Sequence, residues 1–163
     1  MEVQVIDDFL EYKTFKQLQE LVMSSDLSWF FQPIVNNHES NELTCYFTHS
    51  LYNPNKPYVY SEHYHKFLGF WEALEIKSLM RMKLNLYPRV QEIEKHDLHR
   101  DYPFPHKGCV FSFNTCDGGT RFEDGTIVDS VENRAILFDA YELHGSLNTT
   151  NVKGRFNLNI NYF

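Results

Sequence analysis

Two segments of the sequence alternate between apolar and polar residues, and this alternation restricts the fold more than any other feature. Residues 79–87 and residues 155–162 both place an apolar side chain at every second position. Because successive side chains of a β-strand point to opposite faces, each segment is predicted to be a strand with one apolar and one polar face. The apolar face of such a strand must pack against a core, while the polar face meets water or a wet interior.

The polar faces of these two predicted strands carry side chains suited to binding. They present Arg81, Lys83, Asn85, Tyr87, Arg155, Asn157, Asn159 and Asn161. If helices cover the apolar faces, the polar faces line the interior of an open β-barrel, where a site can lie.

Two candidate helices in the N-terminal third could supply this cover. A short strand at residues 3–6 is followed by a helix that Asp7 or Asp8 could cap. Its apolar stripe has helical spacing and consists of Leu10, Phe15, Leu18, Leu21 and Val22. A second helix is expected at residues 62–74, with an apolar face made of Phe67, Phe70, Trp71 and Leu74.

The remaining segments indicate a mainly β fold. We expect loops and one strand near residues 43–47 within residues 25–60, a hairpin at residues 121–128 with an Asp124-Gly125 turn suited to type I′, and a buried strand at residues 135–138. Short strands separated by turns are typical of a sandwich or jelly roll. The length fits one domain, with residues 1–78 as helical support and residues 79–163 as the jelly-roll core.

The composition restricts the partners and the compartment. The formal net charge is −7, and a chain without clustered Lys and Arg is not expected to bind a nucleic-acid backbone. The three cysteines, Cys45, Cys109 and Cys116, are odd in number and lack a CxxC pair, which favours a reduced compartment. The sequence shows no secretory signal and no apolar stretch near the roughly 20 residues of a membrane helix. We therefore expect a soluble, cytoplasmic protein without membrane or nucleic-acid partners.

Three residues form a candidate metal site. His99 and Asp101 are two positions apart, so in a strand their side chains point to the same side, and His144 supplies a second imidazole. Two imidazoles and one carboxylate, with other coordination positions left open, form the facial triad of non-haem Fe(II) oxygenases. A lone His-x-Asp triplet is a weak signal, so the prediction depends on its combination with His144 and with the arginine described next.

Arg155 adds a cation on the polar face of the last predicted strand. A guanidinium group is suited to a bidentate grip on a carboxylate, which predicts an acidic co-substrate beside the iron. His96 and His106 flank the triplet, and we expect both to lie at the surface or to support the ligands indirectly.

The sequence resembles the 2-oxoglutarate and Fe(II)-dependent oxygenases, and within them the prolyl-hydroxylase-like branch that includes small phage and marine bacterial members. The resemblance covers nearly the whole chain, and its motifs are Leu98–Asp101, Asp117–Phe122, Glu132–Phe138, His144 and Arg155–Phe163. It implies a double-stranded β-helix, a distorted cupin-like jelly roll with helices packed on the larger sheet.

The resemblance also implies roles for individual residues. His99, Asp101 and His144 match the iron ligands, and Arg155 matches the residue that grips the far carboxylate of 2-oxoglutarate. Further candidates for that co-substrate are Tyr87 and, less specifically, Asn85 and Asn157. Arg121 matches a substrate-facing arginine of some prolyl hydroxylases, and an exposed hairpin arginine remains an equal alternative. The implied chemistry uses Fe(II), 2-oxoglutarate and O2, with ascorbate as a supporting reductant, and releases succinate and CO2.

The substrate is left open by the sequence. Only residues 102–108 separate Asp101 from the next strand, where many prolyl hydroxylases have a longer mobile loop, and this puts a prolyl substrate in doubt. A peptidyl proline, another amino-acid side chain or a small molecule are the candidates, and aromatic residues could form a groove for one of them: Trp29, Phe30, Phe31, Tyr46, Tyr52, Tyr58, Tyr60 and Tyr64. The alternative function is a non-catalytic jelly-roll module that binds a metal or another ligand.

Overall fold

The computed structural model describes residues 2–33, 35, 45–56 and 60–163. Its helices are α1 (Tyr12–Met23), the 3-10 helix η1 (Tyr64–Phe67) and α2 (Gly69–Ala73). Its strands are β1 (Gln4–Ile6), β2 (Phe30–Gln32), β3 (Tyr46–Tyr52), β4 (Leu79–Pro88), β5 (Lys107–Ser112), β6 (Gly119–Phe122), β7 (Ile127–Asp129), β8 (Arg134–Asp139), β9 (His144–Leu147) and β10 (Gly154–Tyr162).

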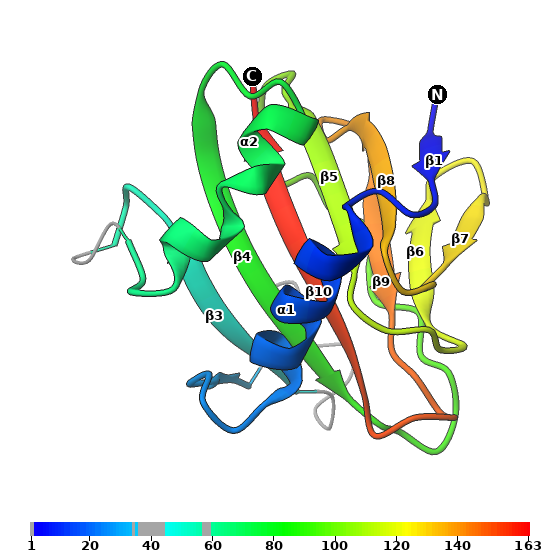
Figure 1. Cartoon of the computed structure of the whole chain (residues 1–163). Coiled ribbons are helices and arrows are strands. Elements are labelled where there is room, and N and C mark those ends of the chain that lie inside the picture. Colours follow the sequence, from blue (N-terminus) through cyan, green and yellow to red (C-terminus); the bar gives the residue numbers. More distant parts are fainter. Residues whose placement is uncertain (1, 34, 36–44, 57–59) are drawn as a thin grey trace.

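The strands form two antiparallel sheets, as expected for a jelly roll. The larger sheet has the order β1-β8-β5-β10-β4-β3-β2, and the smaller one has the order β7-β6-β9. Figure 1 shows α1 and α2 on one face of the larger sheet. The strands β6, β7 and β9 of the smaller sheet lie on the right-hand side of the same view. The predicted mainly β fold with packed helices is confirmed.

Helix α1 covers the larger sheet through the predicted apolar stripe. Phe15, Leu18 and Val22 are buried in one cluster with apolar residues of β4, β5 and β10. The helix begins later than predicted, because Glu11 is its N-cap and accepts a hydrogen bond from the backbone N–H of Thr14 at 3.0 Å. Neither Asp7 nor Asp8 caps the helix.

The second predicted helix is divided into η1 and α2. Phe67 and Phe70 are fully buried, and the rings of Phe70 and Phe111 meet edge to face with centroids 5.0 Å apart. Met82 and Leu84 of β4 belong to the same core. Helices therefore cover the apolar faces of the long strands, as predicted.

The N-terminal third contributes more to the sheet than expected. β1 pairs with β8, and β3 pairs with β4, so the larger sheet is not confined to residues 79–163. The strand expected near residues 43–47 begins at Tyr46 within the described residues, and β2 was not anticipated. The β6–β7 turn is not type I′, because that turn needs a positive φ at both central residues and only Gly125 has one, at 89°.

The polar faces of β4 and β10 lie directly opposite each other. The register pairs Arg155 with Tyr87, Asn157 with Asn85, Asn159 with Lys83, and Asn161 with Arg81. The side of the sheet that carries these pairs faces away from the helices, and most of the residues are buried. The polar faces therefore line an interior, as predicted.

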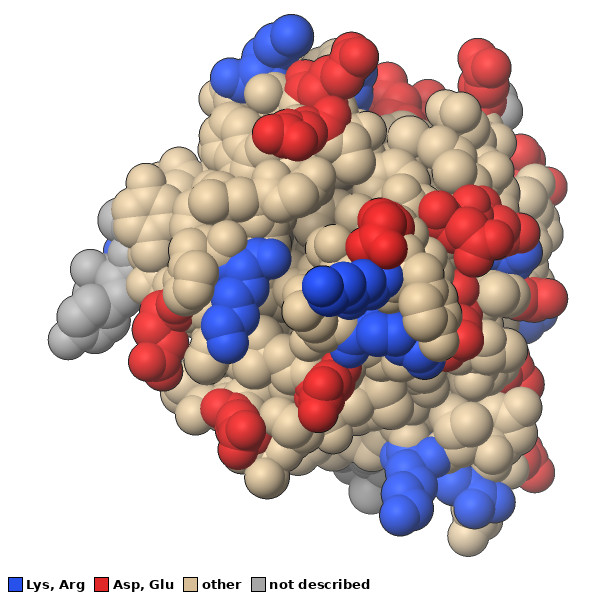
Figure 2. All heavy atoms as spheres, viewed as in Figure 1, with Lys and Arg blue, Asp and Glu red and all other residues tan. Residues whose placement is uncertain are grey.

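Acidic and basic side chains are interspersed on the helix-bearing face of the molecule (Figure 2). This agrees with the acidic balance of the composition and shows no continuous basic surface on that face. Among the described residues, no helix has both the length and the apolar character that a membrane span requires.

Replacing Phe70 with Ala is expected to lower the free energy of unfolding by about 3–5 kcal/mol, since it empties a fully buried ring position between α2 and the sheet. Urea denaturation measures the loss. Leu68→Ala is the control, because Leu68 is 48% exposed and its truncation should change stability by no more than about 0.5 kcal/mol. Equal losses in both variants would contradict the packing described here.

Candidate metal centre

A polar cavity lies between the two sheets. It opens onto the interior faces of β4 and β10 on one side and onto β6 and β9 on the other. Its lining consists of Tyr46, Lys83, Asn85, Tyr87, His99, Asp101, Val110, Thr120, His144, Gly145, Ser146, Arg155, Asn157 and Asn159. The structure thus brings together the three predicted metal ligands, Arg155 and the three weaker co-substrate candidates.

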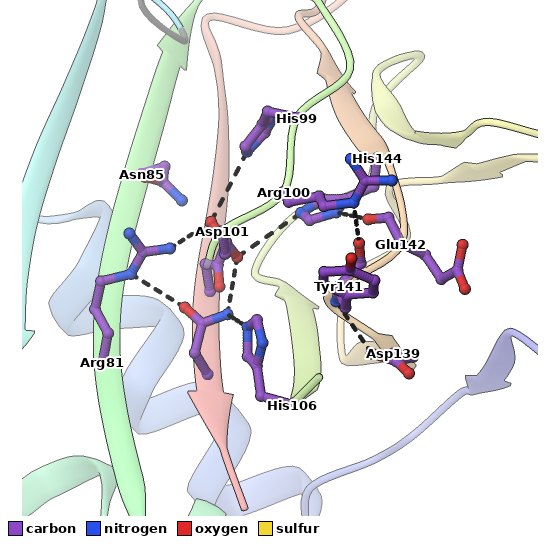
Figure 3. A network of polar contacts seen from close by, with 12 residues as sticks. Arg81, Asn85, His99, Arg100, Asp101, His106, Asp139, Tyr141, Glu142 and His144 are labelled. Carbon is purple, nitrogen blue, oxygen red and sulfur yellow. Dashed lines mark hydrogen bonds and ion pairs between the residues drawn. The ribbon is translucent and has the colours of Figure 1, made fainter. Parts of the chain in front are cut away.

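The three predicted ligands converge at one end of this cavity. Nε2 of His99 lies 3.8 Å from Oδ1 of Asp101, and Nε2 of His144 lies 3.7 Å from Oδ2 of the same carboxylate. One ligand atom from each residue lies within 4.8 Å of the others, and Figure 3 shows both rings turned toward Asp101. Within the described part of the chain, no other group of three or more His, Cys, Asp or Glu residues meets this criterion.

The backbone brings His99 and His144 together without the strand that the sequence suggested for His99 and Asp101. His99 and His144 exchange two backbone hydrogen bonds, of 2.9 and 3.1 Å, in an isolated bridge between a loop and β9. Asp101 lies in a bend two residues further on. The side chains still converge, because the bridge anchors the loop directly beside β9.

His144 is prepared to act as a metal ligand. Its Nδ1 lies 2.9 Å from the backbone oxygen of Glu142, and this contact selects the tautomer with hydrogen on Nδ1. The lone pair of Nε2 then points toward Asp101, and this buried atom has no hydrogen-bond partner among the described residues. A buried imidazole nitrogen without a partner, beside a second imidazole and a carboxylate, fits a divalent metal.

His99 is held in the neutral form that a metal ligand requires. Burial lowers the pKa of His99 to about 4, and nearby His144 contributes to the shift. At neutral pH its ring therefore needs no deprotonation before it binds a metal. The side chain keeps 32% exposure, so this side of the centre faces solvent.

Asp101 is held by a network that the sequence analysis missed. Nη2 of Arg81 donates to Oδ1 at 2.5 Å (Figure 3). Nδ2 of Asn161 donates to Oδ2 at 2.8 Å. Nδ2 of Asn159 lies 3.3 Å from Oδ2. Burial alone would raise the pKa of Asp101, but Arg81 and the other partners outweigh it and hold the pKa below its ordinary value. The carboxylate is therefore ionised and fixed in direction.

His106 supports this network and does not join the ligand cluster. It is buried, and its Nε2 lies 3.2 Å from Nδ2 of Asn161, the amide that binds Asp101. His96 is also buried, with Nδ1 2.7 Å from Oγ of Ser146. Burial lowers the pKa of His96 to about 4. The sequence analysis expected these two histidines either at the surface or as indirect supports of the ligands: both are buried, His106 supports Asp101 through Asn161, and neither belongs to the ligand cluster.

Arg155 is buried at the other end of the cavity with only weak partners. It is 1% exposed, and its long contacts are Nη1 to the backbone oxygen of Leu147 at 3.3 Å and Nη2 to Oγ1 of Thr120 at 3.4 Å. Its Nε has no hydrogen-bond partner, and no carboxylate of the described residues pairs with it. Burial lowers the pKa of Arg155, which marks the cost of holding this charge without an anion.

Tyr87 lies beside Arg155, and the pair Asn85 and Asn157 follows it along β4 and β10 toward the metal ligands. Tyr87 is opposite Arg155 in the register, and the guanidinium carbon lies 5.6 Å from the centre of its ring. Nδ2 of Asn85 donates to Oδ1 of Asn157 at 2.8 Å, and Oδ1 of Asn85 is left without a partner among the described residues. Burial raises the pKa of Tyr87, so its hydroxyl keeps its proton.

Arg121 does not line the cavity. Its Nε and Nη2 donate to the backbone oxygen of His96 at 3.2 and 2.8 Å, and the side chain is half-buried. It therefore braces the loop that carries His96. Arg121 is therefore not a freely exposed hairpin residue, and a role toward the substrate stays a prediction.

Lys83 and Tyr46 line the cavity, although the sequence analysis gave neither a role beside the metal: it placed Lys83 on the interior face and considered Tyr46 for a substrate groove. Burial lowers the pKa of Lys83 to about 8, so most of this lysine remains charged at neutral pH. Tyr46 stacks on Tyr87 with centroids 5.4 Å apart and an interplanar angle of 11°, and burial raises its pKa to about 12. The polar alternation of β4 placed Lys83 on the interior face, but no short motif marked Tyr46.

The structure is similar to solved structures of oxygenases. A prolyl hydroxylase from Trichoplax adhaerens, in complex with a peptide fragment of the hypoxia inducible factor oxygen degradation domain, superposes with a TM-score of 0.69 at 12% identity and covers 99% of this chain and 83% of its own. A 2OG-Fe(II) oxygenase family protein from Burkholderia pseudomallei superposes with a TM-score of 0.67 at 13% identity, and the match covers 98% of this chain and 83% of that protein. A prolyl-4-hydroxylase from Pseudomonas putida superposes with a TM-score of 0.66 at 15% identity, and the match covers 98% of this chain and 91% of that protein.

No protein-family model and no curated protein matches the sequence. The similarity to these solved structures therefore lies in the fold, over nearly the whole chain. The double-stranded β-helix expected from the sequence resemblance is confirmed, and it is the fold of these oxygenases.

Replacing His99 or His144 with Ala is expected to abolish stoichiometric binding of Fe(II), because each variant removes one of three ligands. His96→Ala is the matched control and should keep the metal, since that ring contacts Ser146 and lies apart from the cluster. Anaerobic equilibrium dialysis followed by metal analysis measures the stoichiometry. Full iron loading of the His144 variant, or loss of iron only in the His96 variant, would mean that the ligands are misassigned.

Proposed function

We propose that this chain is a non-haem Fe(II)- and 2-oxoglutarate-dependent oxygenase that hydroxylates a C–H bond and releases succinate and CO2. The observation that carries this proposal is that the His99, Asp101 and His144 cluster shares one buried cavity with Arg155, a cation without a carboxylate partner among the described residues. Residues 1–163 would act as a single catalytic domain.

The metal would be held by His99, Asp101 and His144. Fe(II) bound there would supply the activation of O2 coupled to oxidative decarboxylation of 2-oxoglutarate. The chain would fix the direction of the ligands: the backbone oxygen of Glu142 orients His144, and Arg81 with Asn161 orients Asp101. Such outer contacts keep ligand side chains from turning away.

Arg155 would bind the far carboxylate of 2-oxoglutarate. A buried guanidinium pairs strongly with a carboxylate because the surrounding protein screens the charges less than water does. Tyr87 would add its protonated hydroxyl beside the guanidinium, and Asn85 and Asn157 would border the same molecule. The cavity measures about 50 Å³ and is lined mainly by polar side chains.

The primary substrate would approach from the exposed side of His99. Peptidyl proline or another amino-acid side chain is the favoured class, and exposed Phe30, Phe31 and Tyr60 could contact a peptide. Of the other rings considered for this groove, Trp29 packs on Phe156 and Tyr46 lines the cavity, while Tyr58 lies outside the described residues. The cytoplasmic location and the need for ascorbate remain predictions.

The purified protein is expected to convert 2-oxoglutarate slowly to succinate when supplied with Fe(II), ascorbate and air, and faster with the right substrate. The expectation follows from a site that can hold metal and co-substrate together. Succinate is measured by mass spectrometry, with an anaerobic sample and the His144→Ala variant as controls. Absence of succinate from iron-loaded protein, even with cell extract as a substrate source, would favour the non-catalytic binding module.

Arg155→Ala is expected to weaken 2-oxoglutarate binding by about 2–5 kcal/mol while leaving metal affinity unchanged, because one carboxylate loses its buried partner. Arg155→Lys should give an intermediate loss, since an ammonium cannot form the two parallel hydrogen bonds of a guanidinium. Anaerobic calorimetric titration of 2-oxoglutarate into the metal-loaded variants measures both effects. Unchanged affinity in the Ala variant would refute the assigned role.

A further inference from the structure

Lys83 places a second cation beside the candidate metal ligands. It lies on β4 opposite Asn159, on the same interior face as Tyr87 and Asn85, and it lines the cavity together with His99 and Asp101. Arg155 lies four residues away from Asn159 along β10, opposite Tyr87, at the far end of the cavity. Lys83 is therefore separate from the arginine assigned to 2-oxoglutarate.

The ammonium group of Lys83 has no anionic partner in the described part of the chain. None of the described residues forms a hydrogen bond or an ion pair with it, and its Nζ lies over the ring of Tyr46, 5.6 Å from the centroid. The nearby carboxylate of Asp101 is occupied by Arg81, Asn159 and Asn161. Lys83 is half-buried, and an ammonium group inside a cavity loses part of its hydration, so a ligand that brings an anion to Lys83 would be stabilised.

The charges of the site remain unbalanced even with metal and 2-oxoglutarate bound. Arg81 is matched by Asp101, and Arg155 would be matched by the far carboxylate of 2-oxoglutarate. Lys83 and the divalent metal would then share the near carboxylate alone, which leaves positive charge in excess. An anionic group on a further ligand would neutralise this excess.

We propose that Lys83 binds a carboxylate of the primary substrate and so restricts the substrate to molecules that bring a carboxylate, and no positive charge, into the cavity. This inference rests on the proposed oxygenase function. The restriction on positive charge follows because Asp101 is the one carboxylate among the described residues that line the cavity, and it is already paired. Oδ1 of Asn85, buried and without a partner, would accept an N–H or O–H group of the same ligand.

Matched pairs of small molecules test the proposal: the N-acetyl-L-amino acids, which end in a carboxylate, and the corresponding N-acetyl-L-amino-acid amides, which do not. Protein loaded with Mn(II) and 2-oxoglutarate is titrated without oxygen, and enhanced nuclear relaxation of the probe protons reports binding near the metal. At least one acid should bind ten times more tightly than its amide. Lys83→Met should abolish this preference, and Lys83→Arg should keep it.

Lys107→Met is the control variant, since Lys107 is an exposed strand lysine outside the cavity, and it should leave the preference unchanged. Absence of any acid-over-amide preference in the wild-type protein would overturn the proposal. A tenfold loss of 2-oxoglutarate affinity in Lys83→Met would also overturn it, because Lys83 would then serve the co-substrate. Failure of the wild-type protein to bind 2-oxoglutarate would instead refute the oxygenase function. If Lys83→Met does not fold, the wild-type comparison and Lys83→Arg decide the question.

Discussion

The register between β4 and β10 is the constraint on which the whole site depends. It places four polar pairs across the centre of the larger sheet, from Arg155 and Tyr87 at one end to Asn161 and Arg81 at the other. A shift by one residue would turn these pairs toward the helices and place Met82 and Leu84 in the cavity. The core formed with α1 and α2 opposes such a shift, because both side chains are fully buried there. Packing on one face therefore fixes the chemistry on the other.

The buried polar residues differ in how well their hydrogen bonds are satisfied. At the Asp101 end, each carboxylate oxygen has a donor, and the donors are themselves held by neighbours such as His106. By contrast, Nε2 of His144 beside Asp101, and Nε of Arg155 and Oδ1 of Asn85 further along the cavity, have no hydrogen-bond partner among the described residues. Native proteins satisfy most buried polar atoms, so unsatisfied ones call for an explanation. A satisfied support beside unsatisfied binding atoms is the arrangement expected of a site that takes up ligands.

Much of this architecture could be predicted from local sequence patterns. The alternation in residues 79–87 and 155–162 predicted two long strands, an interior polar face and the placement of Arg155, because side-chain direction in a strand depends only on parity. The stripe of α1 predicted its buried face. The details of chain geometry were less accessible: the N-cap is Glu11, and His99 lies on an isolated bridge where a strand was expected. The bridge depends on a contact with a distant residue, which local patterns do not contain, whereas the Glu11 cap is a local contact with Thr14 that the sequence analysis overlooked.

Arg81 and Lys83 show why the electrostatics of the site could not be predicted in the same way. Both are basic, they lie two residues apart on one strand, and parity places both on the interior face. Arg81 forms an ion pair with Asp101, whereas Lys83 has no such partner among the described residues. The difference arises from the path of the loop between β4 and β5, which the bridge between His99 and His144 anchors so that Asp101 meets Arg81. Which cation is matched and which is left to bind a ligand is therefore a property of the tertiary structure.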